Sequence, residues 1–133
     1  MEIILGVDPG TCISGYGIIR APSEAIDFGC IRPPINLPLE QRYLIIFEGL
    51  CALIEKHKPS AVAVESQFVL KNPQSAIKLG MAKGMAMLAA AQYGIPVYEF
   101  APKKAKQAVV GKGQASKWQV QKMIQICLNL PIL

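Results

Sequence analysis

Short apolar runs separated by turn signals open the chain. Ile3–Asp8 is a β-branched and aliphatic run that ends at Pro9-Gly10, a strong turn dipeptide. Two further strand candidates, Gly15–Arg20 and Ala25–Arg32, are separated by Pro22-Ser23. Three short strands joined by tight turns predict an antiparallel meander at the start of the fold.

From Leu39 the spacing of apolar residues changes to that of a helix. The apolar face consists of Leu39, Tyr43, Ile46, Leu50, Leu53 and Ile54. The charged residues Glu40, Arg42, Glu48 and Glu55 fall largely outside it. The helix is predicted to end at Lys56-His57-Lys58-Pro59, where cations meet the negative end of the helix dipole before a proline. His57 is therefore predicted to be a surface residue.

Strands and helices alternate in the rest of the chain. Ala61–Glu65 is a buried type of strand that ends in a carboxylate, and Ile95–Glu99 is another. Asn72-Pro73 predicts the start of a helix that runs to Tyr93. Two more helices are expected, one from Pro102 and one from the capping box at Ser116. The order βββ-α-β-α-β-α-α predicts an α/β fold with a mixed five-stranded sheet, the later strands being parallel and covered by helices.

The composition is that of one globular domain over residues 1–133, since 52% of the residues are hydrophobic and 17% are charged. A membrane span and a signal peptide are not expected, so the predicted location is the cytoplasm. The cysteines (Cys12, Cys30, Cys51 and Cys127) are scattered and only one histidine is present, which argues against structural zinc. We expect reduced thiols that are mostly packed.

The charge is distributed unevenly along the chain. Residues 1–99 carry eight Lys or Arg and nine Asp or Glu, whereas residues 100–133 carry six lysines and no acid. The respective net charges are −1 and +6. A one-sided basic segment is typical of a nucleic-acid binder, although a solvated helix surface gives the same composition.

Asp8 and Glu65 are the two acids that end apolar strands at turn signals. Sites in such sheets gather at the carboxyl ends of parallel strands, so neighbouring strands would bring both carboxylates to one edge. Paired carboxylates there suit Mg²⁺. The alternative is that one of them caps a turn and the other is incidental. Glu99 is a weaker candidate ligand, and Thr11 with Cys12 would line the wall of the site.

Three further features suggest contacts with DNA or with a second chain. Phe68 lies in a loop and would stack on an unpaired base or cover the sheet end. Lysines surround the glycine-broken turn Gly111–Gly113, where backbone amides can approach a phosphate; they are Lys103, Lys104, Lys106, Lys112 and Lys117. Ala76, Gly80 and Gly84 form a small-residue helix face that would approach the sheet or a partner chain closely.

Taken together, these segments resemble one family. Gly6-Val7-Asp8-Pro9-Gly10-Thr11, followed by Gly15-Tyr16-Gly17, resembles the opening of RuvC-type crossover junction endonucleases. Val64-Glu65-Ser66-Gln67-Phe68 resembles the second acidic strand end of that family and its aromatic loop. The match continues through Ser75–Gly80 and through Lys106–Gly113 into Ala115–Gln121, so that the resemblance covers essentially the whole chain.

The resemblance implies a ribonuclease-H-like fold and a homodimer that resolves four-way (Holliday) DNA junctions by symmetric cleavage. Asp8 and Glu65 match catalytic carboxylates that bind two Mg²⁺ ions, for which Mn²⁺ is a substitute. Phe68 matches the aromatic residue at the junction centre, and Lys106 and Lys117 match residues that face the DNA backbone. The two metal ions would activate water and stabilise the leaving 3′-oxygen. A branch-migration helicase complex is the further partner implied.

The chain departs from the family pattern in its acids. The family supplies two more carboxylates from a final helix, beyond the leucine-proline matched by Leu130-Pro131, whereas this sequence has no Asp or Glu after Glu99. We therefore expect a chain that is truncated relative to the family. An alternative function is a junction-binding module with impaired catalysis. A second alternative, an actin-like ATPase fragment, would require another domain.

Overall fold

The computed structural model describes residues 2–20, 24–66 and 72–100. Five strands form one sheet. The strands are β1 (Ile3–Asp8), β2 (Ser14–Arg20), β3 (Glu24–Ile31), β4 (Ala61–Glu65) and β5 (Val97–Phe100). The helices are α1 (Leu39–His57) and α2 (Pro73–Gln92). Apart from shifts of one or two residues at their ends, these elements confirm the predicted ones, while the helices predicted from Pro102 and Ser116 lie outside the described residues.

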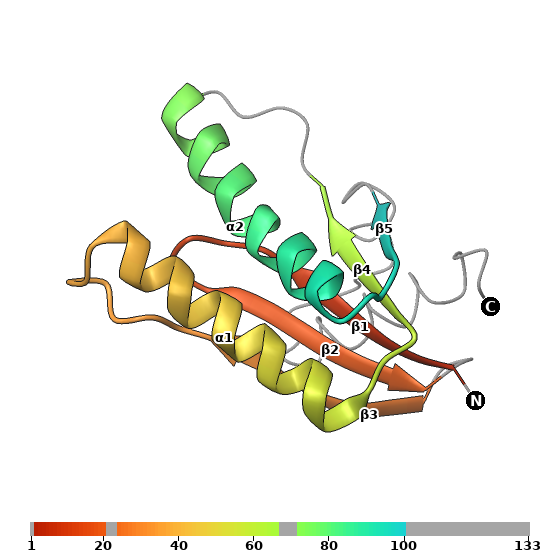
Figure 1. Ribbon diagram of the computed structural model, residues 1–133. Helices are drawn as coiled ribbons and strands as arrows, with labels where there is room; N and C mark the ends of the chain where they lie inside the picture. Colours follow the sequence, from red (N-terminus) through yellow and green to blue (C-terminus); the bar gives the residue numbers. More distant parts are fainter. Residues whose placement is uncertain (1, 21–23, 67–71, 101–133) are drawn as a thin grey trace, which may run out of the picture.

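The strand order in the sheet is β3-β2-β1-β4-β5. β1, β2 and β3 form the predicted antiparallel meander. β4 then pairs with β1 in parallel, and β5 pairs with β4 in parallel. The sheet is therefore mixed, as the order of elements predicts, with β1 at the boundary between its antiparallel and parallel halves (Figure 1).

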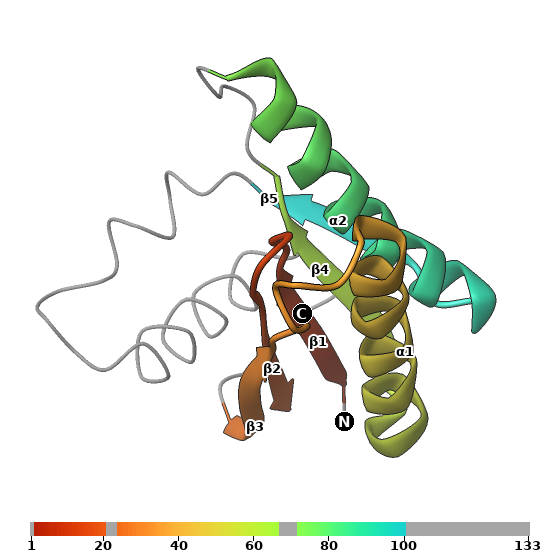
Figure 2. The same cartoon turned by 90° about the vertical axis from the view of Figure 1, so that its left-hand side faces the viewer.

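Both described helices cover the same face of the sheet (Figure 2). Successive side chains of a strand point to opposite faces, so alternate residues of the central strands meet the helices. Leu5, Val7 and Val64 belong to this layer and pack into one core with Ile46 and Leu50 of α1. The next residue of each strand, which includes Asp8 and Glu65, consequently points to the opposite face.

α2 packs on the core through alanines rather than through the small-residue face noted in the sequence. Ala82, Ala86, Ala89 and Ala90 are almost completely buried. By contrast, Ala76 and Gly80 are exposed and Gly84 is partly exposed. An added Cβ at Gly80 or Gly84 would meet nothing within 4 Å. Packing of that face on the protein's own sheet, one of the two options from the sequence, is therefore not observed.

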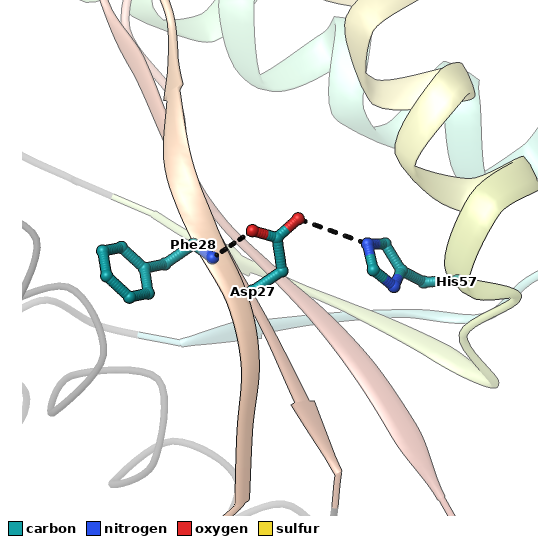
Figure 3. A network of polar contacts seen from close by, with 3 residues as sticks. All are labelled: Asp27, Phe28 and His57. Carbon is teal, nitrogen blue, oxygen red and sulfur yellow. Dashed lines mark hydrogen bonds and ion pairs between the residues drawn. The ribbon is translucent and has the colours of Figure 1, made fainter.

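A polar contact joins the end of α1 to strand β3 (Figure 3). His57 Nε2 lies 3.3 Å from one carboxylate oxygen of Asp27, whose other oxygen accepts a hydrogen bond from the backbone N–H of Phe28 at 2.8 Å. The side chain of His57 is only 11% exposed. The prediction of a surface histidine was wrong, because sequence spacing does not reveal the acid on a neighbouring strand.

The described cysteines differ in burial. Cys51 is buried in the core, as expected, whereas Cys12 and Cys30 are exposed, which corrects the expectation that the thiols are mostly packed. Cys127 lies outside the described residues. No helix within the described part of the chain is long and apolar enough to cross a membrane.

Candidate active site at the carboxyl edge of the sheet

The parallel register of β1 and β4 places the two predicted carboxylates side by side. Val7 pairs with Val64, so the next residues, Asp8 and Glu65, follow at the same level of neighbouring strands. Both point away from the helices, because the preceding valines face them. Glu65 is 4% exposed and Asp8 is partly exposed. The described residues thus present one buried and one more accessible carboxylate on one face.

The turn that follows Asp8 is tight and closed by a side chain. The Ser14 hydroxyl accepts a hydrogen bond from the backbone N–H of Gly10 at 3.1 Å and donates one to its carbonyl at 2.9 Å. A Cβ at Gly10 would lie 2.2 Å from the carbonyl oxygen of Ile13, so only glycine fits without a shift of backbone. These contacts fix the direction in which the chain leaves Asp8.

Hydrogen bonds link this turn to both helices. Arg42 of α1 is buried, and its Nη2 donates to the carbonyl of Thr11 at 2.8 Å. The hydroxyls of Thr11 and Tyr43 both donate to the carbonyl of Lys78 in α2, at 3.3 and 3.2 Å. The turn after Asp8 is therefore anchored to α1 and α2 as well as to its own strands.

A second set of interacting polar side chains lies at the end of β4. Lys83 of α2 forms an ion pair with Glu99 of β5, and its Nζ also donates to the hydroxyl of Ser66 at 2.8 Å. That hydroxyl in turn donates to Glu99. Hydrogen bonds from Lys83 and then from Ser66 hold the pKa of the Glu99 carboxyl below its usual range.

The position of Glu99 bears on its predicted role as a weak metal ligand. Glu99 pairs with Val64 in the β4–β5 register, so it points to the helix face, opposite to Glu65. It is also engaged by Lys83 and Ser66. The structure therefore does not bring Glu99 together with Asp8 and Glu65.

The comparison with protein-family models assigns the chain to a family. The family model described as "Crossover junction endodeoxyribonuclease RuvC" matches residues 4–132. The chain belongs to the RuvC family. Its relatives include a RuvC of Protochlamydia amoebophila, 58% identical over 98% of this chain and 79% of the relative, and a RuvC of Chlamydia pneumoniae, 49% identical over 98% and 80%. This assignment decides against the actin-like ATPase alternative.

Solved RuvC structures share the fold. Thermus thermophilus RuvC covers 98% of this chain and 82% of its own length, with a TM-score of 0.73 and 29% identity. The T. thermophilus RuvC in complex with a Holliday junction substrate superposes with a TM-score of 0.81 at 24% identity, covering 96% of this chain and 91% of that chain. The predicted ribonuclease-H-like fold is thereby confirmed.

The predicted DNA-contacting residues are outside the structural description. Phe68 falls in the gap between residues 66 and 72, and the basic residues all follow residue 100. They are Lys103, Lys104, Lys106, Lys112 and Lys117. Their roles stay predictions. Thr11, expected to line the site, donates a hydrogen bond to the carbonyl of Lys78 in α2, and Cys12 beside it is exposed.

Sequence patterns missed several residues near the candidate site. Arg42 was assigned to the charged side of its helix, yet it is buried against the turn after Asp8. The contacts of Ser66 with Lys83 and Glu99 could not be read from the sequence, because the three residues lie far apart along the chain. The signals available for Ser66 were its place directly after a strand-terminal acid and its inclusion in the segment Val64–Phe68.

The lowered pKa of Glu99 gives a pH-dependent contribution to stability. A carboxyl whose pKa is lower in the folded chain stabilises the fold above its unfolded pKa of about 4.5 and loses this contribution as pH falls through the folded value. We predict that Glu99→Gln lowers the free energy of unfolding at pH 7 and that this difference shrinks below about pH 4.5. Urea unfolding of both proteins across this range measures it. A difference independent of pH would contradict the assignment.

Proposed function

We propose that this chain binds four-way DNA junctions and cleaves a phosphodiester bond at the carboxyl edge of β1 and β4. The single observation that carries the proposal is the β1–β4 register, which sets Asp8 beside Glu65 on one face. Membership of a family described as crossover junction endodeoxyribonucleases supports the choice of substrate. A cytoplasmic location and an association with a branch-migration helicase complex belong to the same proposal.

The donor set at this edge fits a hard cation. Two carboxylates offer the oxygen ligands that Mg²⁺ takes in proteins, and Mn²⁺ accepts the same set. Among residues 2–20, 24–66 and 72–100, no group of three or more His, Cys, Asp or Glu side chains is placed to hold a metal ion. The described residues therefore fit one ion that keeps several waters. Bound there, Mg²⁺ would polarise the scissile phosphate and lower the pKa of an attached water.

We assign the remaining roles in metal binding and DNA binding to residues of the chain itself. Asp8 and Glu65 supply the negative charge, and the burial of Glu65 makes that charge act in a less polar environment. Lys106 and Lys117 are proposed to face the DNA backbone near the scissile bond. Phosphate contacts from Lys103, Lys104 and Lys112 would supply much of the affinity and make it dependent on salt. Phe68 is proposed to stack at the junction centre.

A second candidate function is junction binding with little cleavage. Within residues 2–20, 24–66 and 72–100, the carboxylates at this edge are those of Asp8 and Glu65, whereas hydrolysis with two metal ions normally uses more carboxylates as ligands and bridges. Electrostatic stabilisation of this kind is commonly worth several kcal/mol. We therefore propose that a polypeptide of these 133 residues binds junctions and cuts them slowly, and that extension by an acidic segment of the family accelerates the cut.

Replacement of Asp8 separates binding from cleavage. In a chain extended by the family's acidic segment, we predict that Asp8→Asn lowers Mg²⁺-dependent cleavage of a synthetic four-way junction by roughly 100-fold or more, because the carboxylate ligand is lost. The junction affinity of Asp8→Asn in Ca²⁺ should be unchanged.

The complementary double variant Lys106→Ala with Lys117→Ala should weaken junction binding and reduce the salt dependence of that binding, because phosphate contacts are lost.

Three results would count against this proposal. Efficient cleavage by Asp8→Asn would remove Asp8 from the site. Unchanged affinity of the lysine variant would remove these lysines from DNA binding. Fast Mg²⁺-dependent resolution by the 133-residue polypeptide itself would contradict the second candidate function.

We also propose a two-fold symmetric homodimer formed through the outer face of α2. Large apolar side chains are exposed there, with Ile77 63%, Met81 47% and Leu88 54% exposed. Met81 and Leu88 also line a groove of about 520 Å³ between α2 and α1. The adjacent Gly80 leaves space for close approach by another helix. A symmetric junction is most simply matched by a symmetric protein.

Light scattering tests this interface. We predict a dimeric mass at micromolar concentration for the unmodified chain and a monomeric mass for Met81→Asp, because a charge would be buried at the contact. Ile35→Asp is the matched control, since Ile35 is 73% exposed on the loop before α1. It should remain dimeric. A dimer that tolerates Met81→Asp would place the interface elsewhere.

A further inference from the structure

Lys83, Ser66 and Glu99 form a closed ring of polar contacts beside the proposed metal site. Each of the three side chains contacts the other two, and they come from α2, the end of β4 and β5 respectively. Ser66 is 3% exposed, and the side chain of Lys83 is 27% exposed. The ring therefore holds two strands and a helix together at one point.

That point is the carboxyl end of β4. The pairing of β4 with β1 ends at Val64, whereas its pairing with β5 continues to Glu65 opposite Phe100. Ser66 follows Glu65 directly, so its hydrogen bonds limit how far the strand end can swing.

We propose that Lys83, Ser66 and Glu99 are positioning residues, which fix the end of β4 so that the Glu65 carboxylate is held in place to bind the metal ion beside Asp8. The inference rests on the metal site of the proposed function and adds residues that touch neither metal nor DNA. Residues that orient a metal ligand without touching the metal commonly matter for binding. Their removal typically lowers metal affinity by about ten- to 100-fold.

The arrangement is suited to this role because the three residues approach from the face opposite to the metal ligands. Val64 and Ser66 point toward the helices, so Glu65 between them points away. Lys83 and Glu99 therefore hold the strand end through the Ser66 hydroxyl and leave the Glu65 carboxylate to the other face. A role in stability alone would leave metal affinity unchanged in variants that remain folded.

Binding of Mn²⁺ to the 133-residue chain, measured by calorimetry, tests the inference without any cleavage step. The variants are Ser66→Ala, Lys83→Met and Glu99→Gln, each compared with the unmodified chain. Simple Coulomb effects on the ion would have opposite signs, because Lys83→Met removes a positive charge and Glu99→Gln a negative one. Positioning instead predicts that all three variants weaken Mn²⁺ binding, by about tenfold.

Two controls accompany these variants. Lys83→Arg keeps a cationic donor and should largely restore the Mn²⁺ affinity that Lys83→Met loses. Glu24→Gln breaks the exposed ion pair between Arg20 of β2 and Glu24 of β3 and should leave the Mn²⁺ affinity unchanged. Thermal unfolding of each variant confirms that the fold persists at the temperature of the titration.

The outcomes distinguish the inference from the proposed function on which it rests. If Asp8→Asn abolishes Mn²⁺ binding while the three ring variants bind as tightly as the unmodified chain, the positioning role is wrong and the metal site stands. Tighter binding by Lys83→Met with weaker binding by Glu99→Gln also overturns positioning, in favour of a charge effect. If the unmodified chain does not bind Mn²⁺, or if Asp8→Asn leaves binding unchanged, the metal site fails and the positioning role with it.

Discussion

The parallel pairing of β1 with β4 is the constraint on which the rest of the site depends. It joins two segments separated in sequence by β2, β3 and α1, and it sets Val7 opposite Val64. Burial of both valines against the helices makes the register specific, because a slip of one residue would turn them to the other face. The same slip would separate Asp8 from Glu65. Core packing on one face thus determines the chemistry available on the other.

Polar contacts then secure the two strand ends by different means. The turn after Asp8 is closed by Ser14 and anchored through Arg42 to α1. The end of β4 is linked to α2 and β5 by Lys83 and Glu99. In both places the tethering atoms are buried or partly buried, where water competes less for the hydrogen bonds. The helices on one face therefore position the carboxylates of the other.

The strands and the helices could be predicted because they depend on local patterns. The proximity of Asp8 to Glu65 could be predicted only on the condition that their strands are parallel neighbours. Apolar runs such as Ile3–Asp8 end at turn dipeptides, and carboxyl ends of neighbouring parallel strands share one edge. The contacts of Arg42, Lys83 and His57 could not be predicted. Each joins residues far apart in sequence, and a charged residue on a helix resembles a solvated one until its partner is known. The direction of Glu99 likewise depended on the β4–β5 register.

The central claim is that Asp8 and Glu65 together hold the metal ion used in junction cleavage. A crystal of the chain grown with Mn²⁺ and measured at the manganese absorption edge tests it most directly. The account predicts an anomalous peak between the two strand ends, with an oxygen of Asp8 and an oxygen of Glu65 each within coordination distance of it. A peak bound to Glu99 in place of Glu65, or no peak at the carboxyl edge of β1 and β4, would contradict it.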